Sequence, residues 1–283
     1  MLSTPGHSGA TAQQEPAREG RLNLEPGKTM FYRIDDCVGS SQPCESVFFV
    51  HGIGESGAAW AQWVPHFTPW YRVIRIDQRG FGQSTPMPKD FPWSLDQLAS
   101  DLILAIGELA PGAPVHVVAA KAGGAVAIKA ATLRPDLVSS LTLAGTPVVG
   151  PDTRSAIEHI EQHGLRRWAQ DTFDARFGTQ LDGATREWWI DLMSATPLPT
   201  IIGFLRFVSS VDVTNLLPLL SCPTQVLATD SRRRPWIEFV AWQHNISGSS
   251  ILWVPGDGYH AAACNPEFCA SATVAFLQRL SRS

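Results

Sequence analysis

Short apolar segments that alternate with amphipathic helical segments are the feature of this sequence that most restricts its fold. Helical periodicity covers residues 94–110, 123–135 and 266–281. The short apolar segments that alternate with these helices are residues 30–35, 46–52, 71–77, 115–121, 141–146, 223–230, 236–245 and 249–256. Apolar strands with few charges are typical of a parallel sheet that helices cover on both faces. The sequence therefore predicts an α/β fold with a mostly parallel sheet of about eight strands.

A chain of 283 residues, 44% of them hydrophobic, has enough apolar material for one large α/β domain. Residues 1–20 are rich in small and polar residues and predict a disordered tail. We expect the core of the domain in residues 21–150 and 221–283. Residues 151–220 contain only helical patterns, so we expect a helical lid inserted between two strands, above the carboxyl ends of the sheet.

Several aromatic residues of the expected lid, among them Trp168, Trp188 and Trp189, are candidates for contact with an apolar substrate. For any single one of them, packing within the lid is an equally good explanation. As a group they favour an apolar substrate.

Charge and cysteine content exclude several classes of function. The net charge of -4 gives no indication of a nucleic-acid partner, and no apolar stretch is long enough to span a membrane. The five cysteines are too irregular for a disulfide framework, which favours a cytoplasmic protein. Cys37 and Cys44 are close enough to pair or to bind a metal, but we expect ordinary thiols. We expect no cofactor and no metal, and the sequence leaves a homodimer open.

Four segments have an order and spacing that resemble the α/β-hydrolase superfamily over residues 22–281. They are FFVHGIGESGAAW (48–60), VIRIDQRGFGQS (73–84), VHVVAAKAGGAVAI (115–128) and GDGYHAAACNPE (256–267). The resemblance implies an α/β-hydrolase fold, in which the backbone NH of Ile53 or Gly54 contributes to an oxyanion hole. It also implies that His260 is the general base. Asp77 and Arg79 correspond to positions that are usually structural.

The segment 115–128 departs from the family at its central position. The family has Gly-x-Ser-x-Gly between a strand and a helix, and here Ala119, Ala120, Lys121, Ala122 and Gly123 occupy that register. The small residues at both ends predict that the sharp turn is intact, with Lys121 at its apex in place of the serine nucleophile. The backbone NH of Ala122 at the helix start remains available as the second oxyanion donor.

The sequence also departs from the family at the position of the acid of the catalytic triad. In PTQVLATDSRRRP (223–235), arginines occupy the positions where the family usually places an aspartate. Asp230 is the only carboxylate there, and it could reach His260 or form an ion pair with Lys121. Glu55, in the oxyanion loop, is a competing partner for Lys121.

The protonation state of Lys121 decides which chemistry is open to it. A free lysine amine is almost fully protonated at neutral pH, but burial and nearby NH dipoles lower its pKa, whereas a nearby carboxylate raises it. A neutral Lys121 could form a Schiff base with a carbonyl compound or act as a base on water. A cationic Lys121 would polarise a carbonyl while His260 activates water. An acyl-enzyme is excluded unless Ser56 or Cys264 replaces the missing serine.

We therefore expect a hydrolase-like enzyme that acts on a small carbonyl compound: an ester, a lactone, or a β-dicarbonyl compound or oxo-acid. Lys121, His260 and Asp230 are the expected catalytic residues. Glu55, Ser56, Trp168, Trp188 and Trp189 are expected to contact the substrate. The helical pattern of residues 158–227 resembles the enol-lactonase and carbon–carbon hydrolase branch of the superfamily. Arg232, Arg233 and Arg234 could bind a substrate carboxylate, although a solvated loop explains them equally well.

Two alternatives stay open at this stage. A superfamily member without its nucleophile can persist as a small-molecule binding protein, in which Lys121 only neutralises a carboxylate. The same residues could also serve a lyase or cyclase of a biosynthetic pathway. We favour an enzyme, because His260 and both oxyanion elements are retained.

Overall fold

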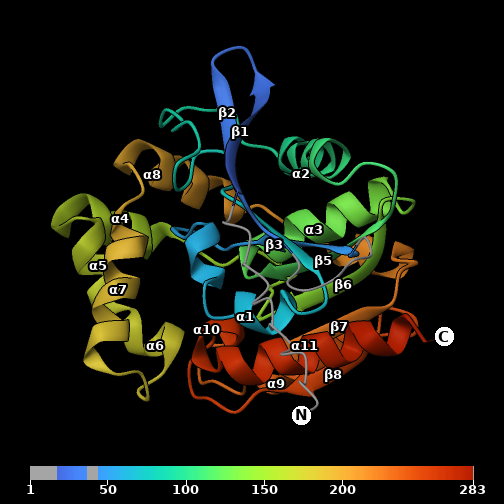
Figure 1. Cartoon of the computed structure of the whole chain (residues 1–283). Coiled ribbons are helices and arrows are strands. Elements are labelled where there is room, and N and C mark those ends of the chain that lie inside the picture. Colours follow the sequence, from blue (N-terminus) through green and yellow to red (C-terminus); the bar gives the residue numbers. More distant parts are fainter. Residues whose placement is uncertain (1–17, 37–43, 283) are drawn as a thin grey trace, which may run out of the picture.

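The computed structural model describes residues 18–36 and 44–282 and contains one eight-stranded sheet (Figure 1). The strands are β1 (Arg18–Glu25), β2 (Lys28–Asp35), β3 (Ser46–Val50), β4 (Arg72–Ile76), β5 (Val115–Ala120), β6 (Val138–Ala144), β7 (Thr224–Ala228) and β8 (Ser250–Trp253). Their order in the sheet is β1-β2-β4-β3-β5-β6-β7-β8. β1 and β2 are antiparallel to their neighbours, and all the other pairs are parallel. The predicted fold class is confirmed.

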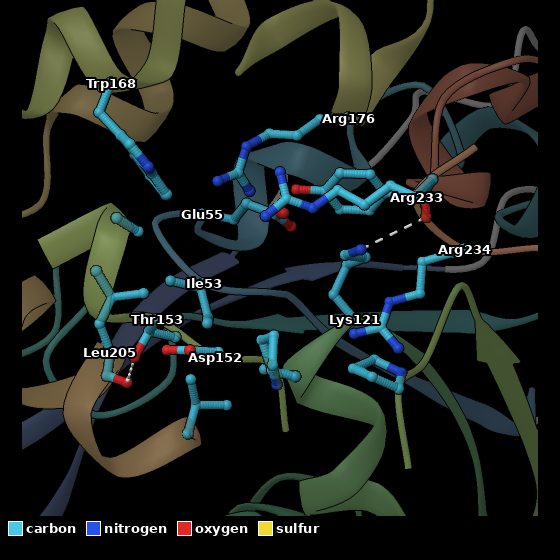
Figure 2. Close-up of a pocket in the computed structure, with 16 residues that line it drawn as sticks. Ile53, Glu55, Lys121, Asp152, Thr153, Trp168, Arg176, Leu205, Arg233 and Arg234 are labelled. Atoms are coloured by element: carbon cyan, nitrogen blue, oxygen red, sulfur yellow. Dashed lines mark hydrogen bonds between the residues drawn. The ribbon is translucent and has the colours of Figure 1, made fainter. Parts of the chain in front are cut away.

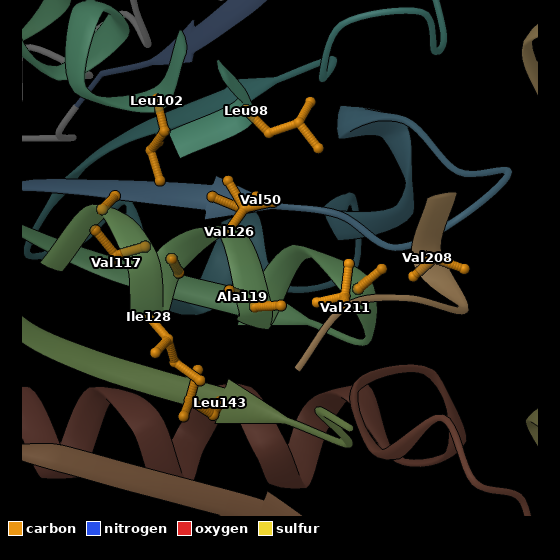
Figure 3. Close-up of a cluster of buried hydrophobic side chains, with 14 of the residues drawn as sticks. Val50, Leu98, Leu102, Val117, Ala119, Val126, Ile128, Leu143, Val208 and Val211 are labelled. Atoms are coloured by element: carbon orange, nitrogen blue, oxygen red, sulfur yellow. The ribbon is translucent and has the colours of Figure 1, made fainter. Parts of the chain in front are cut away.

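The sheet is buried on both faces because its central strands alternate their side chains between two hydrophobic clusters. In β3, Phe48 and Val50 join a cluster that includes residues of α2 (Leu95–Leu109) and α3 (Ala122–Leu133). Figure 3 shows Val50 in this cluster, close to Leu98 of α2 and Val126 of α3. Val47 and Phe49 point to the opposite face, where α1 (Val64–Phe67) and α11 (Pro266–Leu280) pack. Such alternation follows from the two-residue repeat of a strand.

Helices fill the interval between β6 and β7, and in Figure 1 they form the group at one side of the sheet. They are α4 (Arg154–His163), α5 (Leu165–Asp171), α6 (Phe173–Phe177), α7 (Gly183–Ser194) and α8 (Leu198–Val208), followed by the 3-10 helix η2 (Thr214–Leu219). The remaining helices are the 3-10 helix η1 (Gly57–Trp60), α9 (Trp236–Gln243) and α10 (Ala261–Cys264). Within the described ranges, no helix is both long and apolar enough to cross a membrane.

Two local features differ from the sequence-based expectations. Residues 18–20, expected in the tail, belong to β1, which is held by pairing to β2 although its own residues are mostly polar. The part of the expected tail that covers residues 1–17 lies outside the described residues. The segment 236–245, which lacked a helical assignment, contains helix α9, whose Phe239 and Trp242 pack into the core.

Cysteine chemistry provides a further correction. Cys44 is disulfide-bonded, whereas Cys222, Cys264 and Cys269 are free thiols. The expectation of an ordinary thiol is therefore wrong for Cys44, and the expectation for Cys37 lies outside the described residues. Disulfides persist mainly in oxidising environments, so this bond removes one argument for a cytoplasmic location.

Candidate active site

Lys121 lies at the apex of a strained turn between β5 and α3. Its φ of 55° and ψ of -126° make it the only non-glycine residue with positive φ in the described part of the chain. A side chain rarely adopts this conformation unless the surrounding structure enforces it. The turn is tight because α3 approaches β3 closely: a Cβ atom at Gly123 would lie 2.4 Å from the carbonyl oxygen of His51.

The Lys121 amine faces an aromatic ring and a backbone carbonyl. Nζ lies 3.6 Å from the centroid of the Tyr259 ring and 3.5 Å from the Tyr259 carbonyl oxygen (Figure 2). Among residues 18–36 and 44–282, no carboxylate oxygen forms an ion pair with Nζ. The amine therefore has no carboxylate to stabilise its ammonium form, and only the ring face and the carbonyl oxygen of Tyr259 favour that form.

The electrostatic surroundings lower the pKa of Lys121 well below its usual value. Burial is the largest cause, and the positive charges of Arg234 and Arg176 act in the same direction. Glu55 opposes the shift but does not reverse it. These surroundings favour the neutral amine, the form in which lysine is a nucleophile.

His260 and Glu55 form a buried hydrogen-bonded pair beside the turn. Nε2 of His260 lies 2.9 Å from Oε1 of Glu55, and Oε2 of Glu55 accepts a hydrogen bond of 3.0 Å from the backbone NH of Gly52. The imidazole packs against two rings that also contact each other: its centroid lies 5.5 Å from that of Phe177 and 5.7 Å from that of Trp189. Burial alone would raise the pKa of Glu55, but the charge and hydrogen bond of His260, together with the Gly52 hydrogen bond and the His51 charge, lower the pKa below its usual value.

Asp230 does not pair with His260. Its side chain is exposed and accepts a hydrogen bond of 2.9 Å from the backbone NH of Trp236, at the start of α9. Nδ1 of His260 is buried and has no hydrogen-bond partner among the described residues. The structure thus joins His260 to Glu55 through Nε2 and leaves the other nitrogen, which the family's acid would contact, unpartnered.

The expected oxyanion elements flank Lys121. Ile53, in the loop after β3, and Ala122, the first residue of α3, both line the pocket that contains the lysine. Within the described residues neither amide donates a backbone hydrogen bond, so both remain available to a ligand oxygen. Gly54 has a φ of 71° and does not line the pocket, which leaves Ile53 as the donor from this loop.

The pocket above Lys121 is formed by loops at the carboxyl edge of the sheet and by the helices between β6 and β7, as shown in Figure 2. Glu55, Lys121 and Tyr259 come from loops after β3, β5 and β8. Trp168 of α5 and Leu205 of α8 contribute an apolar wall. A position beyond the carboxyl ends of parallel strands is the usual ligand site of an open α/β sheet.

Three arginines also line this pocket: Arg176, Arg233 and Arg234. The guanidinium of Arg176 lies 4.2 Å from the Trp168 ring centroid, and its Nε donates to the hydroxyl of Thr172. Neither Arg176 nor Arg233 forms an ion pair within the described ranges, whereas Arg234 lies 3.8 Å from Glu238. The pocket therefore contains two guanidinium groups without an ion-pair partner in the described part, while its carboxylates, Glu55 and Asp152, contact His260 and Arg154.

The other expected substrate contacts are divided between several locations. Trp168 lines the pocket, but Trp189 packs against His260 and Trp188 is 42% exposed on another face of the helical segment. The Ser56 side chain caps η1 rather than facing the pocket. Burial raises the pKa of Cys264 to about 11, so its thiol is a poor replacement for the missing serine.

Sequence reasoning missed two residues that line the pocket, Tyr259 and Arg176. Tyr259 directly precedes the candidate histidine, and its ring contacts Lys121. Arg176 lies in a helical segment whose charges are mostly on the surface, so its sequence carries no signal that sets it apart. Arg176 reaches the pocket at the carboxyl edge of the sheet only through the tertiary packing of its helix.

Comparisons with known proteins agree with this architecture. The family described as alpha/beta hydrolase fold matches residues 45–186. The chain belongs to this family. The enol-lactonase of Burkholderia xenovorans LB400 superimposes with a TM-score of 0.82 at 16% identity, over 92% of this chain and all of the other chain, which supports the fold.

Two curated relatives of the family illustrate its range. The chain is 41% identical over 102 residues, 36% of its length, to the pimeloyl-[acyl-carrier protein] methyl ester esterase of Methylococcus capsulatus. It is 23% identical over 77% of its length to 84% of the Karrikin insensitive 2 receptor CA of Petunia hybrida. The chain spans only 21 to 37% of the length of several curated relatives that it matches. The relatives include esterases and epoxide hydrolases as well as proteins named as probable oxidoreductases, so the activities that their names state differ.

Proposed function

We propose that this protein is an enzyme that forms a Schiff base between Lys121 and a small carbonyl compound bearing an anionic group. The observation that carries the proposal is the position of the amine: it lies at the apex of the turn, in a pocket, without a carboxylate ion-pair partner in the described residues and with a lowered pKa. A neutral amine held in this way attacks a ketone or aldehyde, and the resulting imine is an electron sink for cleaving an adjacent bond.

The pocket also supplies groups suited to the remaining steps. The free amides of Ile53 and Ala122 are available to the oxygen of the carbonyl group, where negative charge develops during attack. The Glu55–His260 pair is available for proton transfer. The substrate classes compatible with this chemistry are β-dicarbonyl compounds and oxo-acids, and the reaction class is cleavage of a carbon–carbon bond.

The positive charge of the pocket supports an anionic substrate. Arg176 and Arg233 line the pocket without ion-pair partners among the described residues, and guanidinium groups bind carboxylates through charged, often bidentate hydrogen bonds. The helices between β6 and β7 would act as a lid that brings Arg176 over the bound substrate.

Reductive trapping tests the proposal. The protein is incubated with levulinate, a small oxo-acid, and sodium cyanoborohydride, and intact mass and peptide mapping follow. We expect one adduct, with a mass gain equal to the probe less one oxygen atom, on Lys121. Labelling spread over surface lysines, with Lys121 unmodified, would contradict the proposal.

Replacing Arg176 with glutamine tests the anionic part of the substrate. Because a hydrogen bond to a charged group contributes about 1.5–3 kcal/mol, we expect half-saturation of trapping by levulinate to require about 10- to 100-fold more probe. The neutral methyl ester of levulinate should show no such change. Arg166→Gln is the matched control, since Arg166 pairs with Glu187 and Asp191 at the surface of the same helical segment. Equal losses for acid and ester would refute carboxylate recognition.

A small-molecule receptor is the second candidate. The Petunia receptor covers most of this chain, and the pairing of His260 with Glu55 rather than with Asp230 leaves the usual triad incomplete. A receptor would show ligand-dependent stabilisation and no Lys121-dependent trapping or turnover.

A further inference from the structure

Glu55 and His260 differ in their access to the pocket that contains Lys121. Glu55 lines the pocket with Lys121, whereas His260 does not. The imidazole is 3% exposed, packs against the neighbouring rings of Phe177 and Trp189, and directs Nε2 at the carboxylate. Any substrate in this pocket therefore meets the carboxylate before it meets the imidazole.

Glu55 also lies close to the base of the Lys121 side chain. A Cβ atom built on Gly52 would be 2.9 Å from Oε1 of Glu55 and 2.9 Å from Cβ of Lys121. The carboxylate is fixed in this position on two sides, by the backbone NH of Gly52 and by Nε2 of His260. Such fixation by hydrogen bonds is what positions a group for proton transfer.

We propose that Glu55 exchanges protons with the reacting atoms of the substrate, and that His260 is a positioning residue behind it. This inference rests on the proposed Schiff-base function. It reverses the order expected from the sequence, in which the imidazole faces the substrate and a carboxylate stands behind the imidazole. The unpartnered Nδ1 of His260 agrees with this reversal, because no carboxylate of the described residues supports the imidazole from that side.

Lys121 Nζ forms a bond to the carbonyl carbon, and the carbon–oxygen double bond becomes a single bond to an alkoxide. The Glu55 carboxylate takes one proton from the positively charged nitrogen and returns it to this oxygen, which gives a neutral carbinolamine. The hydroxyl then takes a second proton from solvent and leaves as water. The iminium ion that forms carries one positive charge beside the regenerated carboxylate.

Several titratable and charged groups surround Glu55 or line the pocket with it. They are His260 and His51, the Lys121 amine, and the pocket groups Asp152, Arg176, Arg233, Arg234 and Tyr259. Of these, His260 lowers the pKa of Glu55 most. Removing His260 leaves the effect of burial less opposed, so the pKa of Glu55 rises.

The experiment measures the rate of levulinate trapping against pH in wild type, Glu55→Gln, Glu55→Asp and His260→Asn. In Glu55→Gln we expect the maximal rate to fall about 100-fold, the contribution typical of general acid–base catalysis. A carboxylate that only attracts the ammonium ion gives the opposite result, because its removal leaves more neutral amine and a rate that is unchanged or faster. Glu55→Asp should recover part of the rate.

His260→Asn should lower the maximal rate by less than about tenfold and move the acidic limb of the profile to higher pH, since the carboxylate then becomes protonated sooner. Loss of the reaction in His260→Asn together with an unchanged rate in Glu55→Gln would overturn the inference. Two controls verify that the pocket of each variant is folded: thermal unfolding, and saturation by pentanoate, which has a carboxylate but no ketone.

The outcomes distinguish this inference from the proposed function. If wild type forms no Lys121 adduct, the proposed function fails. If wild type forms the adduct and Glu55→Gln reacts as fast, only this inference fails.

Discussion

The Lys121→Met variant is expected to lose levulinate trapping and turnover by at least about three orders of magnitude, because a nucleophile removed from a catalytic unit is not replaced by its neighbours. Methionine keeps most of the aliphatic length of lysine and lacks the amine that lies over the Tyr259 ring, so the pocket shape changes little. The measurement is single-turnover trapping followed by mass spectrometry, together with product formation from an oxo-acid.

Lys129→Met is the matched control for this prediction. Lys129 lies on α3, eight positions after Lys121, but its amine pairs with Asp96 of α2 and takes no part in lining the pocket. We expect wild-type trapping in this variant. Turnover that survives in Lys121→Met would exclude any direct chemical role of the Lys121 amine.

Lys121→Ser should not create an efficient esterase. The side chain would stand at the expected apex, but Nε2 of His260 is bound to Glu55, and Asp230 is engaged by the backbone of Trp236. A serine there would lack the imidazole base of a triad, because the nitrogen that would accept its proton is engaged by Glu55. Hydrolysis of p-nitrophenyl acetate above the rate of Lys121→Ala would show instead that His260 can turn toward the apex.

Gly123→Ala is expected to destabilise the protein by about 2–4 kcal/mol, a loss within the upper range for overpacked core sites. The added Cβ would lie 2.4 Å from the His51 oxygen and 2.7 Å from the Val50 oxygen. Both are backbone atoms of the central strand and the loop after it, so they cannot move aside as a flexible side chain would. Urea unfolding followed by circular dichroism measures the change.

Gly107→Ala is the control for the glycine prediction. Gly107 lies in α2, and a Cβ there would meet no atom within 4 Å. Alanine favours helices over glycine, so this variant should gain about 0.5–1 kcal/mol. Equal stability of the two variants would mean that the turn relaxes freely around Gly123.

The fold could be predicted because the signals that determine it are local and redundant. Apolar strands such as Val115–Ala120 are buried on both faces and remain recognisable by composition alone. β1 could not be predicted in this way: its side chains are mostly exposed and polar, and its order comes from pairing with β2. The bonded state of Cys44 was also missed, since sequence spacing allows a bond without requiring one.

The candidate site was predictable only where a motif fixes the backbone. Lys121, Ile53 and Ala122 stand where the strand-to-helix turn and the loop after β3 put them. The pairing of His260 with Glu55 depends on side-chain directions from two distant loops, which no spacing in the sequence encodes. Arg176 reaches the pocket from a helix between β6 and β7, so its position follows from tertiary packing.

The positive φ of Lys121 has a consequence for how this site could change. The strained apex is held by α3 and β3 and not by the side chain that it carries, so the fold maintains the same vector from Cα to Cβ for any occupant. Glycine at position 121 would relieve the strain and make the protein more stable, but it would remove the reactive amine. A single amino-acid substitution at the apex can therefore change the reactive group without changing the backbone that holds it. The partners around it must change separately, because they belong to other loops.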